Sequence, residues 1–597
     1  MTSPTDTYLL LRAFVDELTR CGLRAACTSP GSRCAPLVLT LAREQRLRCF
    51  SHVDERCAGF FALGLAKASG LPVAAVCTSG TAAAELLPAA IEARQARVPL
   101  LLLTADRPPE LREVGAGQTI DQLKLFGGAA KWFFEVGVHA ASEERLRWMR
   151  TLACRAYWTA LEGRSGVVHL NFPLHEPLVC DERLAPDVTA RQERHPYVQR
   201  PPGRLSAPDA LLTLYELVAS SRRGLVVAGR EESDGRPSVG PTHPPTAGEA
   251  AAAFAAAAGW PVLADPLSGA RRGGAAIAHY DALLREESFT ARVRPDLVIR
   301  VGDLPTSKPL RAWLAGLEGV RQVALDPEGA WQDPAAVLSD SLALDPAAAL
   351  SELASARSAH EDEWLASWRS ADQSAATAIL GVLGDSQLSE PAVAAELGVL
   401  LPAVATLFVA SSMPVRDIET FWPARPDPPR VLCNRGANGI DGTVSCAFGA
   451  AAAGSDPVVL LIGDVALAHD IGGLLAARRL ELNLTIVLLD NAGGGIFDFL
   501  PISGAKMALS QDIYTRHIAT PTGLDFAAAA ALYGLAHERV QDVRGFRAAL
   551  ERALAHAGSS IVEVRTDRKA NVELHRRVWQ AVSGALSRPA AAAAPPT

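Results

Sequence analysis

Two apolar segments in the last third of the chain each run into a pair of polar residues, and this pattern constrains the fold more than any other feature. The first segment ends at Gly463-Asp464 and the second at Asp490-Asn491. Strand ends of this kind are typical of a parallel α/β sheet, whose carboxyl edge binds phosphorylated ligands. A carboxylate, an amide oxygen and a nearby backbone carbonyl are hard oxygen ligands that suit Mg²⁺. The pattern therefore predicts a metal site at a sheet edge, with two ordinary buried strands as the alternative.

Strand-like and helix-like patterns alternate through most of the chain. A chain of 597 residues should hold about three or four domains. An apolar run at 73–77, a helical pattern at 83–96 and a leucine run at 100–103 form a βαβ unit, which implies a parallel sheet. We expect three successive doubly wound parallel-sheet α/β domains at residues 1–185, 205–355 and 375–585, followed by a disordered Pro- and Ala-rich tail at 588–597.

Composition excludes several classes of protein. The chain has 58 Lys and Arg against 65 Asp and Glu, a net charge of −7, which argues against a general nucleic-acid binder. Its first residues lack the basic and apolar regions of a secretory signal, and no apolar run predicts a membrane span. The ten cysteines are scattered without paired metal-ligand spacing, as expected for small core residues in a reducing compartment. We therefore expect a cytoplasmic protein.

Two junctions in the first block carry candidate functional residues. Glu55 stands in the polar run 51–56 just before a helical pattern, where an acidic residue either favours the positive helix end or belongs to a site. Thr78-Ser79-Gly80-Thr81 follows a strand and opens another helix, and its small residues allow a ligand close to the backbone. A plain strand-to-helix turn is the alternative for this second segment.

Basic residues recur in loops that contain glycine or proline. These loops are Ser29–Arg33, Thr104–Pro109, Thr306–Pro309, Met413–Arg416 and Asn434–Gly436. The planar fork of an arginine guanidinium suits bidentate binding of a carboxylate. Any one of these loops could be solvated surface charge. Together they predict a site that collects several carboxylates.

Longer motifs resemble one family of thiamine-diphosphate-dependent enzymes. In chain order these motifs are Ser29–Arg33, Asp54–Arg56, Thr78–Thr81, Thr104–Leu111, Asn434–Gly442 and Gly493–Phe497. Over nearly the whole chain the series resembles the MenD family, the 2-succinyl-5-enolpyruvyl-6-hydroxy-3-cyclohexene-1-carboxylate synthases of menaquinone biosynthesis. Within the metal motif, Val465 and Asp490 stand where the usual pattern has glycine and asparagine. The resemblance implies the three-domain fold of thiamine-diphosphate enzymes, with a pyrimidine-binding domain at 1–185, a central α/β domain at 205–355 and a diphosphate- and metal-binding domain at 375–585.

The resemblance also implies the cofactor and its contacts. Thiamine diphosphate would bind with Mg²⁺ or Mn²⁺, and the metal ligands would be Asp464, the Asn491 side chain and the Gly493 carbonyl. Glu55 would face N1′ of the aminopyrimidine and promote ylide formation, while Ile440 would hold the cofactor bent. The implied cofactor-binding residues are Glu55, Thr78, Ser79, Gly80, Ile440, Gly463, Asp464 and Asn491.

A carbon–carbon bond-forming transferase reaction follows from the same resemblance. It decarboxylates 2-oxoglutarate and adds the succinyl carbanion in conjugate fashion to isochorismate. Both substrates are dianions, which gives the basic loops a role. Arg416 and Arg435, with Ser412 nearby, would face the succinyl carboxylate, and both arginines would join Glu55 and Ile440 as catalytic residues. The implied isochorismate contacts are Ser32, Arg33, Arg107, Gln118 and Lys308.

The family's assembly implies a homodimer or a dimer of dimers, with Glu55 and Asp464 of one site supplied by different subunits. Two other functions remain open: another thiamine-diphosphate-dependent 2-oxoacid decarboxylase or carboligase, and an inactive ligand-sensing relative. The first block has no His-His pair of the kind that such decarboxylases use. A sensor would not need the combination of Glu55, Asp464 and Asn491.

Overall fold

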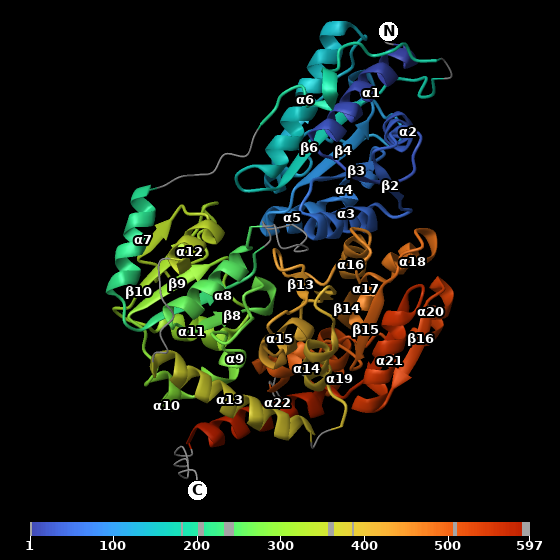
Figure 1. Cartoon of the computed structure of the whole chain (residues 1–597). Helices are drawn as coiled ribbons and strands as arrows, with labels where there is room; N and C mark the ends of the chain where they lie inside the picture. The colour runs from blue at the N-terminus through green and yellow to red at the C-terminus, as the bar shows by residue number, and fades with distance from the viewer. Residues whose placement is uncertain are drawn as a thin grey trace.

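Three parallel sheets follow one another along the chain (Figure 1). The computed structural model describes residues 3–180, 183–200, 208–231, 244–355, 363–384, 387–504 and 510–587. The predicted fold class, three parallel-sheet α/β domains, is confirmed. The domain bounds given above stay a prediction, and the tail at 588–597 lies outside the described residues.

The first sheet has six parallel strands in the order β2-β1-β3-β4-β6-β5. Its strands are β1 (Ala25–Thr28), β2 (Arg48–Ser51), β3 (Val73–Cys77), β4 (Leu100–Asp106), β5 (Ala130–Glu135) and β6 (Val167–Pro173). The helices of this domain are α1 (Pro4–Cys21), α2 (Ala35–Arg43), α3 (Glu55–Ser69), α4 (Thr81–Glu85), α5 (Leu87–Ala96) and α6 (Glu143–Leu161).

The central sheet has five parallel strands in the order β11-β10-β9-β7-β8. Its strands are β7 (Gly224–Ala228), β8 (Val262–Ala264), β9 (Leu297–Val301), β10 (Arg321–Leu325) and β11 (Asp340–Leu342). The helices are α7 (Pro208–Ser220), α8 (Ala247–Ala258), α9 (Tyr280–Leu283), α10 (Glu287–Thr290), α11 (Lys308–Ala315), α12 (Pro346–Ser355) and α13 (Glu363–Gly384).

The third sheet repeats the topology of the first, with six parallel strands in the order β13-β12-β14-β15-β17-β16. Its strands are β12 (Thr406–Val409), β13 (Arg430–Cys433), β14 (Val458–Gly463), β15 (Thr485–Asp490), β16 (Ala536–Val540) and β17 (Ser560–Arg565). The helices are α14 (Glu390–Leu400), α15 (Met413–Phe421), α16 (Thr443–Ala451), α17 (Asp464–His469), α18 (Leu475–Arg479), α19 (Gln511–Tyr514), α20 (Phe526–Tyr533), α21 (Val543–Ala555) and α22 (Arg568–Ser587).

Inner strands are buried and largely apolar because helices cover both faces of each sheet. All residues of β3 and β4 are buried, whereas the edge strand β5 is only half-buried. Continuous apolar runs are typical of strands buried in this way. The helix expected at 83–96 is divided into α4 and α5, because Pro88 has no N–H to donate to the carbonyl four residues earlier.

One apolar core joins the first and third domains. It contains Phe61 of α3 and Leu102 of β4 together with Cys446 of α16 and Leu460 of β14. A second core joins the third domain to the central one through α13, where Trp368 packs among residues of both. The three sheets are therefore held together by shared apolar layers.

Helices α3 and α16 pack closely where the first and third domains meet (Figure 1). A Cβ at Gly64 would lie 1.9 Å from the carbonyl oxygen of Cys446, and one at Gly449 would lie 2.1 Å from the carbonyl oxygen of Phe61. Each helix thus brings a glycine against the backbone of the other. Only a residue without a side chain permits so close an approach.

Polar contacts fix α15 to the central domain. Arg271 is buried, and its Nη1 donates to the carbonyls of Glu419 and Trp422, both at 3.0 Å. Thr420 Oγ1 donates to Asp281 Oδ2 at 3.2 Å. The helix that begins just after Ser412 is therefore held at its far end. Among the residues described, no helix has the length and apolarity needed to cross a membrane.

The glycine contact between α3 and α16 gives the first prediction. A Gly64→Ala change should lower the free energy of unfolding by about 1–3 kcal/mol, because the new methyl group overlaps a backbone carbonyl that cannot move freely. Gly381→Ala in α13 is the matched control, since nothing lies within 4 Å of a Cβ there. Thermal and denaturant unfolding of the two variants measures the difference. Equal stability of the two variants would contradict the proposed close contact.

Candidate functional site

The polar residues that follow β14 and β15 lie side by side at one edge of the third sheet. The strands pair in parallel, with Gly463 opposite Leu489. Asp464 is the first residue of α17, directly after β14, and Asn491 directly follows β15. The sequence prediction that these residues share a sheet edge is therefore consistent with the register.

Asp464 and Asn491 present oxygens that fit a hard cation. Asp464 is buried, and its Oδ2 accepts the Gly493 N–H at 2.8 Å. Burial first, and then the charge of Asp490, raise the pKa of Asp464 to about 6. Asn491 Oδ1 is buried and has no hydrogen-bond partner within the described part of the chain. An orphaned amide oxygen beside a buried carboxylate is a donor set suited to Mg²⁺ or Mn²⁺.

The Gly493 backbone takes a conformation that only glycine adopts readily. Its φ is +135°, and a Cβ there would lie 2.5 Å from the carbonyl oxygen of Ala519. The Gly493 carbonyl, the third expected metal ligand, accepts the Gly495 N–H at 2.9 Å. A carbonyl oxygen has a second lone pair, so this bond leaves it able to bind a metal.

Glu390, a residue that carries no sequence motif, orients the Asn491 amide. Its Oε1 accepts Asn491 Nδ2 at 2.9 Å and Thr566 Oγ1 at 2.9 Å. Because the amide nitrogen is bound on one side, the amide oxygen must face the other. Glu390 is buried at the start of α14, about a hundred residues before Asn491, so no local pattern could reveal it.

Glu55 is the first residue of α3 and is only partly buried. The helix cap is its neighbour Asp54, whose side chain accepts the N–H groups of Arg56 and Cys57 at 2.8 and 3.2 Å. Burial raises the pKa of Glu55, with smaller effects from nearby carboxylates. The capping role thus belongs to Asp54, which leaves the Glu55 carboxyl available for a ligand.

Segments that follow β3 and β4 meet in the first domain. Arg107 donates to the Ser79 hydroxyl, and the Ser79 hydroxyl donates to the Gln118 carbonyl at 3.1 Å. Gln118 Nε2 donates to the Ser79 carbonyl at 2.9 Å. Gly80 has φ +88° and donates its N–H to Gln122 Oε1 at 2.9 Å. Gln122 is a second residue that no sequence motif indicated.

The loop after β1 packs beside this group. A Cβ at Gly31 would lie 2.4 Å from Cβ of Thr78, so the two loops touch. Ser32 is exposed, whereas Arg33 is buried and pairs with Glu176 at 2.9 Å. Burial and then the charge of Arg33 lower the pKa of Arg107, which indicates that the two guanidinium groups lie near each other.

Three guanidinium groups gather where the central and third domains meet. Burial first, and then the charge of Arg435, lower the pKa of Arg416, and Arg311 lowers it further. Arg311 keeps an exposed face, and burial followed by the charge of Arg435 lowers its pKa as well. Arg311 lies on α11 three positions after the predicted Lys308, which is exposed at the start of that helix. Lys308 was predicted from its proline-marked loop, whereas no sequence motif indicated Arg311.

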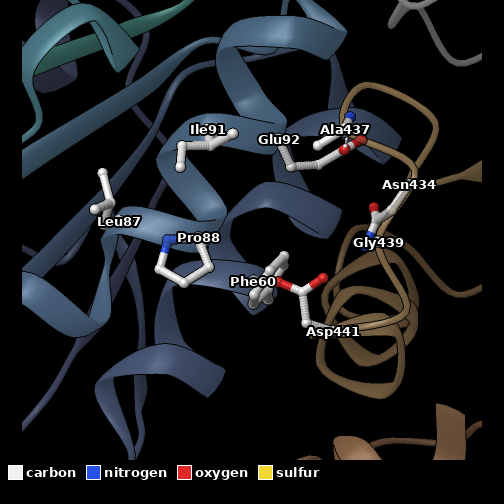
Figure 2. Close-up of a pocket in the computed structure, with 9 residues that line it drawn as sticks. All are labelled: Phe60, Leu87, Pro88, Ile91, Glu92, Asn434, Ala437, Gly439 and Asp441. Carbon is white, nitrogen blue, oxygen red and sulfur yellow. Dashed lines mark hydrogen bonds between the residues drawn. The ribbon is translucent and has the colours of Figure 1, made fainter.

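The N-terminal end of α15 and the loop after β13 carry the remaining expected residues. Ser412 has φ +76°, a strained conformation for a residue with a side chain. Ile440 is half-buried against the core shared by the first and third domains. Beside it is a pocket of about 220 Å³. The pocket is lined by Phe60 of α3, by residues of α5 and by Gly439 and Asp441 of the loop after β13 (Figure 2).

Weaker metal binding is expected when the Asn491 amide loses its anchor. A Glu390→Ala change should raise the Kd for Mn²⁺ or Mg²⁺ by about 10–100-fold, because groups that orient metal ligands typically contribute that much. Mn²⁺ titration of the protein with thiamine diphosphate, followed by electron paramagnetic resonance, measures the Kd. Thr566→Val, which removes the other donor to the same Glu390 oxygen, is the control and should change the Kd far less. An unchanged Kd in Glu390→Ala would contradict the role of Glu390.

Family models match all three domains. The thiamine pyrophosphate enzyme N-terminal TPP binding domain matches residues 10–125, the middle domain of thiamine pyrophosphate matches 192–409, and the C-terminal TPP binding domain matches 415–564. A solved structure of a thiamin diphosphate-dependent enzyme from Mycobacterium smegmatis has the same fold, with a TM-score of 0.67 at 20% identity over 94% of this chain and 99% of that one.

Curated relatives match over almost the full length. The 2-succinyl-5-enolpyruvyl-6-hydroxy-3-cyclohexene-1-carboxylate synthase of Geobacillus kaustophilus is 43% identical over 96% of this chain and 98% of its own. The synthase of the same name from Chloroflexus aurantiacus is 42% identical over 96% of both chains. The cofactor is accordingly thiamine diphosphate with a divalent metal. The chain belongs to the family of thiamine-diphosphate-dependent 2-succinyl-5-enolpyruvyl-6-hydroxy-3-cyclohexene-1-carboxylate synthases.

Proposed function

We propose that the chain converts 2-oxoglutarate and isochorismate to 2-succinyl-5-enolpyruvyl-6-hydroxy-3-cyclohexene-1-carboxylate and CO₂, a step of menaquinone biosynthesis. The bond between C1 and C2 of 2-oxoglutarate breaks as CO₂ leaves. A new carbon–carbon bond forms to the isochorismate ring, which loses one of its two double bonds and takes up a proton from solvent. The observation that carries this proposal is the group Arg311, Arg416 and Arg435 in a chain of this family. Like charges gathered at one place favour an anionic ligand.

The residues of the third domain have distinct parts in this proposal. Asp464, Asn491 and the Gly493 carbonyl would hold the divalent metal, and Gly463 would contact the cofactor. Arg416 and Arg435, with Ser412, bind the carboxylate at the far end of 2-oxoglutarate. The partly exposed Arg311 adds a third positive charge there. Guanidinium forks orient a carboxylate as well as binding it.

In the first domain, Glu55 would hold a proton at its carboxyl group against the cofactor's pyrimidine ring. Its raised pKa keeps that proton bound at higher pH than an ordinary carboxyl would. When bound, thiamine diphosphate supplies the nucleophilic carbon and the electron sink that 2-oxoacid decarboxylation needs. Thr78, Ser79 and Gly80 would line the cofactor, and Ile440 would pack against it.

Isochorismate would lie over the strand ends of the first domain. Its expected contacts are Ser32, Arg33, Arg107, Gln118 and Lys308. The meeting of Arg107 with Ser79 and Gln118 supports this placement, as does the proximity of Arg33 to Arg107. Arg33 already pairs with Glu176, so its contact with a substrate would require that acid to share the guanidinium.

We also propose a homodimer or dimer of dimers in the cytoplasm, with each site built from two subunits. Apolar side chains are exposed around the candidate residues of the first domain: Val53 is 56% exposed, Val114 68% and Leu123 45%. A second copy of the chain that covered them would remove apolar surface from water. All ten cysteines are free thiols, which fits a reducing compartment.

Substrate consumption tests the reaction directly. Isochorismate absorbance should fall only when 2-oxoglutarate, thiamine diphosphate and Mg²⁺ are all present. A Glu55→Gln change should lower kcat by about 10²–10⁴-fold, because it removes the proton that the carboxyl group shares with the cofactor. Release of CO₂ from 2-oxoglutarate without loss of isochorismate would instead favour a decarboxylase or a different carboligase. Cofactor binding with no reaction at all would favour an inactive ligand-sensing relative.

Subunit mixing tests the shared site. Glu55→Gln and Asp464→Ala proteins should each be inactive alone. After subunit exchange, random pairing should restore about a quarter of wild-type activity, because half of the dimers then contain one intact site. The recovered rate is measured by the same loss of isochorismate absorbance. No recovery despite proven exchange would show that each site lies within one chain.

A further inference from the structure

A lysine and a glutamate are buried together where the first domain meets the third. Lys67 of α3 is 2% exposed and Glu92 of α5 is 3% exposed, and Lys67 Nζ lies 3.6 Å from Glu92 Oε1. Removing two charges from water is costly, and their attraction offsets that cost only when further hydrogen bonds complete the arrangement. The stability of this buried pair therefore depends on the other groups that Lys67 and Glu92 bind.

Both partners bind the backbone that follows β13. Glu92 Oε1 accepts the Gly436 N–H at 2.8 Å, and Glu92 Oε2 accepts the Ala437 N–H at 2.6 Å. Lys67 Nζ donates to the Cys433 carbonyl at 2.9 Å. Figure 2 shows the Glu92 carboxylate directed from α5 toward Ala437. The pair thus holds the backbone on both sides of Arg435.

Two further contacts fix the same loop. Ser411 Oγ donates to the Asn434 carbonyl at 3.2 Å. A Cβ at Gly436 would lie 2.7 Å from the Glu92 carbonyl oxygen, so the loop also lies tightly against α5. By contrast, the Arg435 side chain makes no hydrogen bond or ion pair with any residue that the structure describes.

Electrostatic repulsion acts against the position of Arg435. Arg435 lies close enough to Arg416 and Arg311 to disfavour their charged forms. Without a ligand, this repulsion tends to move Arg435 away, and within the described ranges its side chain has no partner to prevent that. Backbone bonds at 433, 436 and 437 resist the movement.

We propose that Lys67 and Glu92 are positioning residues, which hold Arg435 beside Arg416 before the dicarboxylate substrate arrives. The inference rests on the proposed function, in which Arg435 binds the far carboxylate of 2-oxoglutarate. Neither residue touches the substrate, and both act through the backbone of the loop. The site is therefore preorganised by a charge pair that belongs to a different domain from the residue it positions.

Limited proteolysis tests the anchor without substrate or cofactor. In a Glu92→Gln variant one carboxylate acceptor for the loop is lost, so the loop should open more often. Trypsin should then cleave after Arg435 at least about tenfold faster than in the wild type, since a buried backbone hydrogen bond has been lost. Cleavage is followed by mass spectrometry of the native protein.

Kinetics provide the second readout. The KM for 2-oxoglutarate should rise about tenfold in Glu92→Gln with a smaller change in kcat, because the carboxylate-binding arginine is less well placed. Glu17→Gln is the matched control: Glu17 is also buried, pairs with the buried Arg150 at 2.7 Å and accepts the Tyr197 N–H. It lies in α1 in the separate core on the other side of the first sheet, and should lower stability without altering cleavage at Arg435 or the KM.

The results distinguish a positioning role of Glu92 from a general contribution to the stability of the fold. If Glu92→Gln lowers the melting temperature as Glu17→Gln does, but leaves cleavage at Arg435 and the KM unchanged, the proposal is overturned. Should the variant fail to fold, hydrogen exchange of the wild type decides: the amides of Gly436 and Ala437 should exchange slowly, and fast exchange overturns the proposal. Absence of synthase activity in the wild type would refute the proposed function, while the proteolysis result would still test the anchor.

Discussion

The close contact of α3 with α16 is the constraint on which the rest of the molecule depends. Gly64 and Gly449 bring two backbones together inside one apolar core that spans the first and third sheets. Glu55 begins one of these helices, and Ile440 lies just before the other. Since helices in close packing cannot slide independently, both residues have fixed places relative to the core. In the proposed function, the roles of Glu55 and Ile440 therefore depend on packing contacts that take no part in the reaction.

Buried acidic residues and arginines have different surroundings in this protein. Buried acids such as Glu390 and Glu92 bind N–H groups that orient a ligand-bearing side chain or loop. The arginines, in contrast, stand near one another with few acidic partners of their own. An arrangement of this kind is unfavourable in the empty protein and becomes favourable when a dianion is bound. In the proposed function, backbone contacts such as those at Gly436 and Ala437 hold the arginines in place until the substrate neutralises their charge.

The three-sheet fold and part of the candidate site were predictable from local sequence. Gly463-Asp464 and Asn491 were found because apolar strands end at them, and parallel strands bring their carboxyl ends to one edge. The three α/β sheets followed from alternating patterns. Glu390 and Gln122 were not predicted, because each binds a partner that is distant in sequence. Arg311 was not predicted because it lies beyond the proline-marked loop that contains Lys308. Periodicity reports which face of an element is buried, but not which buried carboxylate binds a particular amide.

The identical strand order of the first and third sheets has a further consequence. The end of the third strand in sequence carries Thr78 in one domain and Asp464 in the other, and the end of the fourth carries Arg107 in one and Asn491 in the other. In the proposed function, the same path of the chain therefore lies once beside the metal and once beside the cofactor and isochorismate. The two domains differ in function through a few residues that follow equivalent strands. Changes at these residues in one domain can therefore leave the fold of the other domain intact.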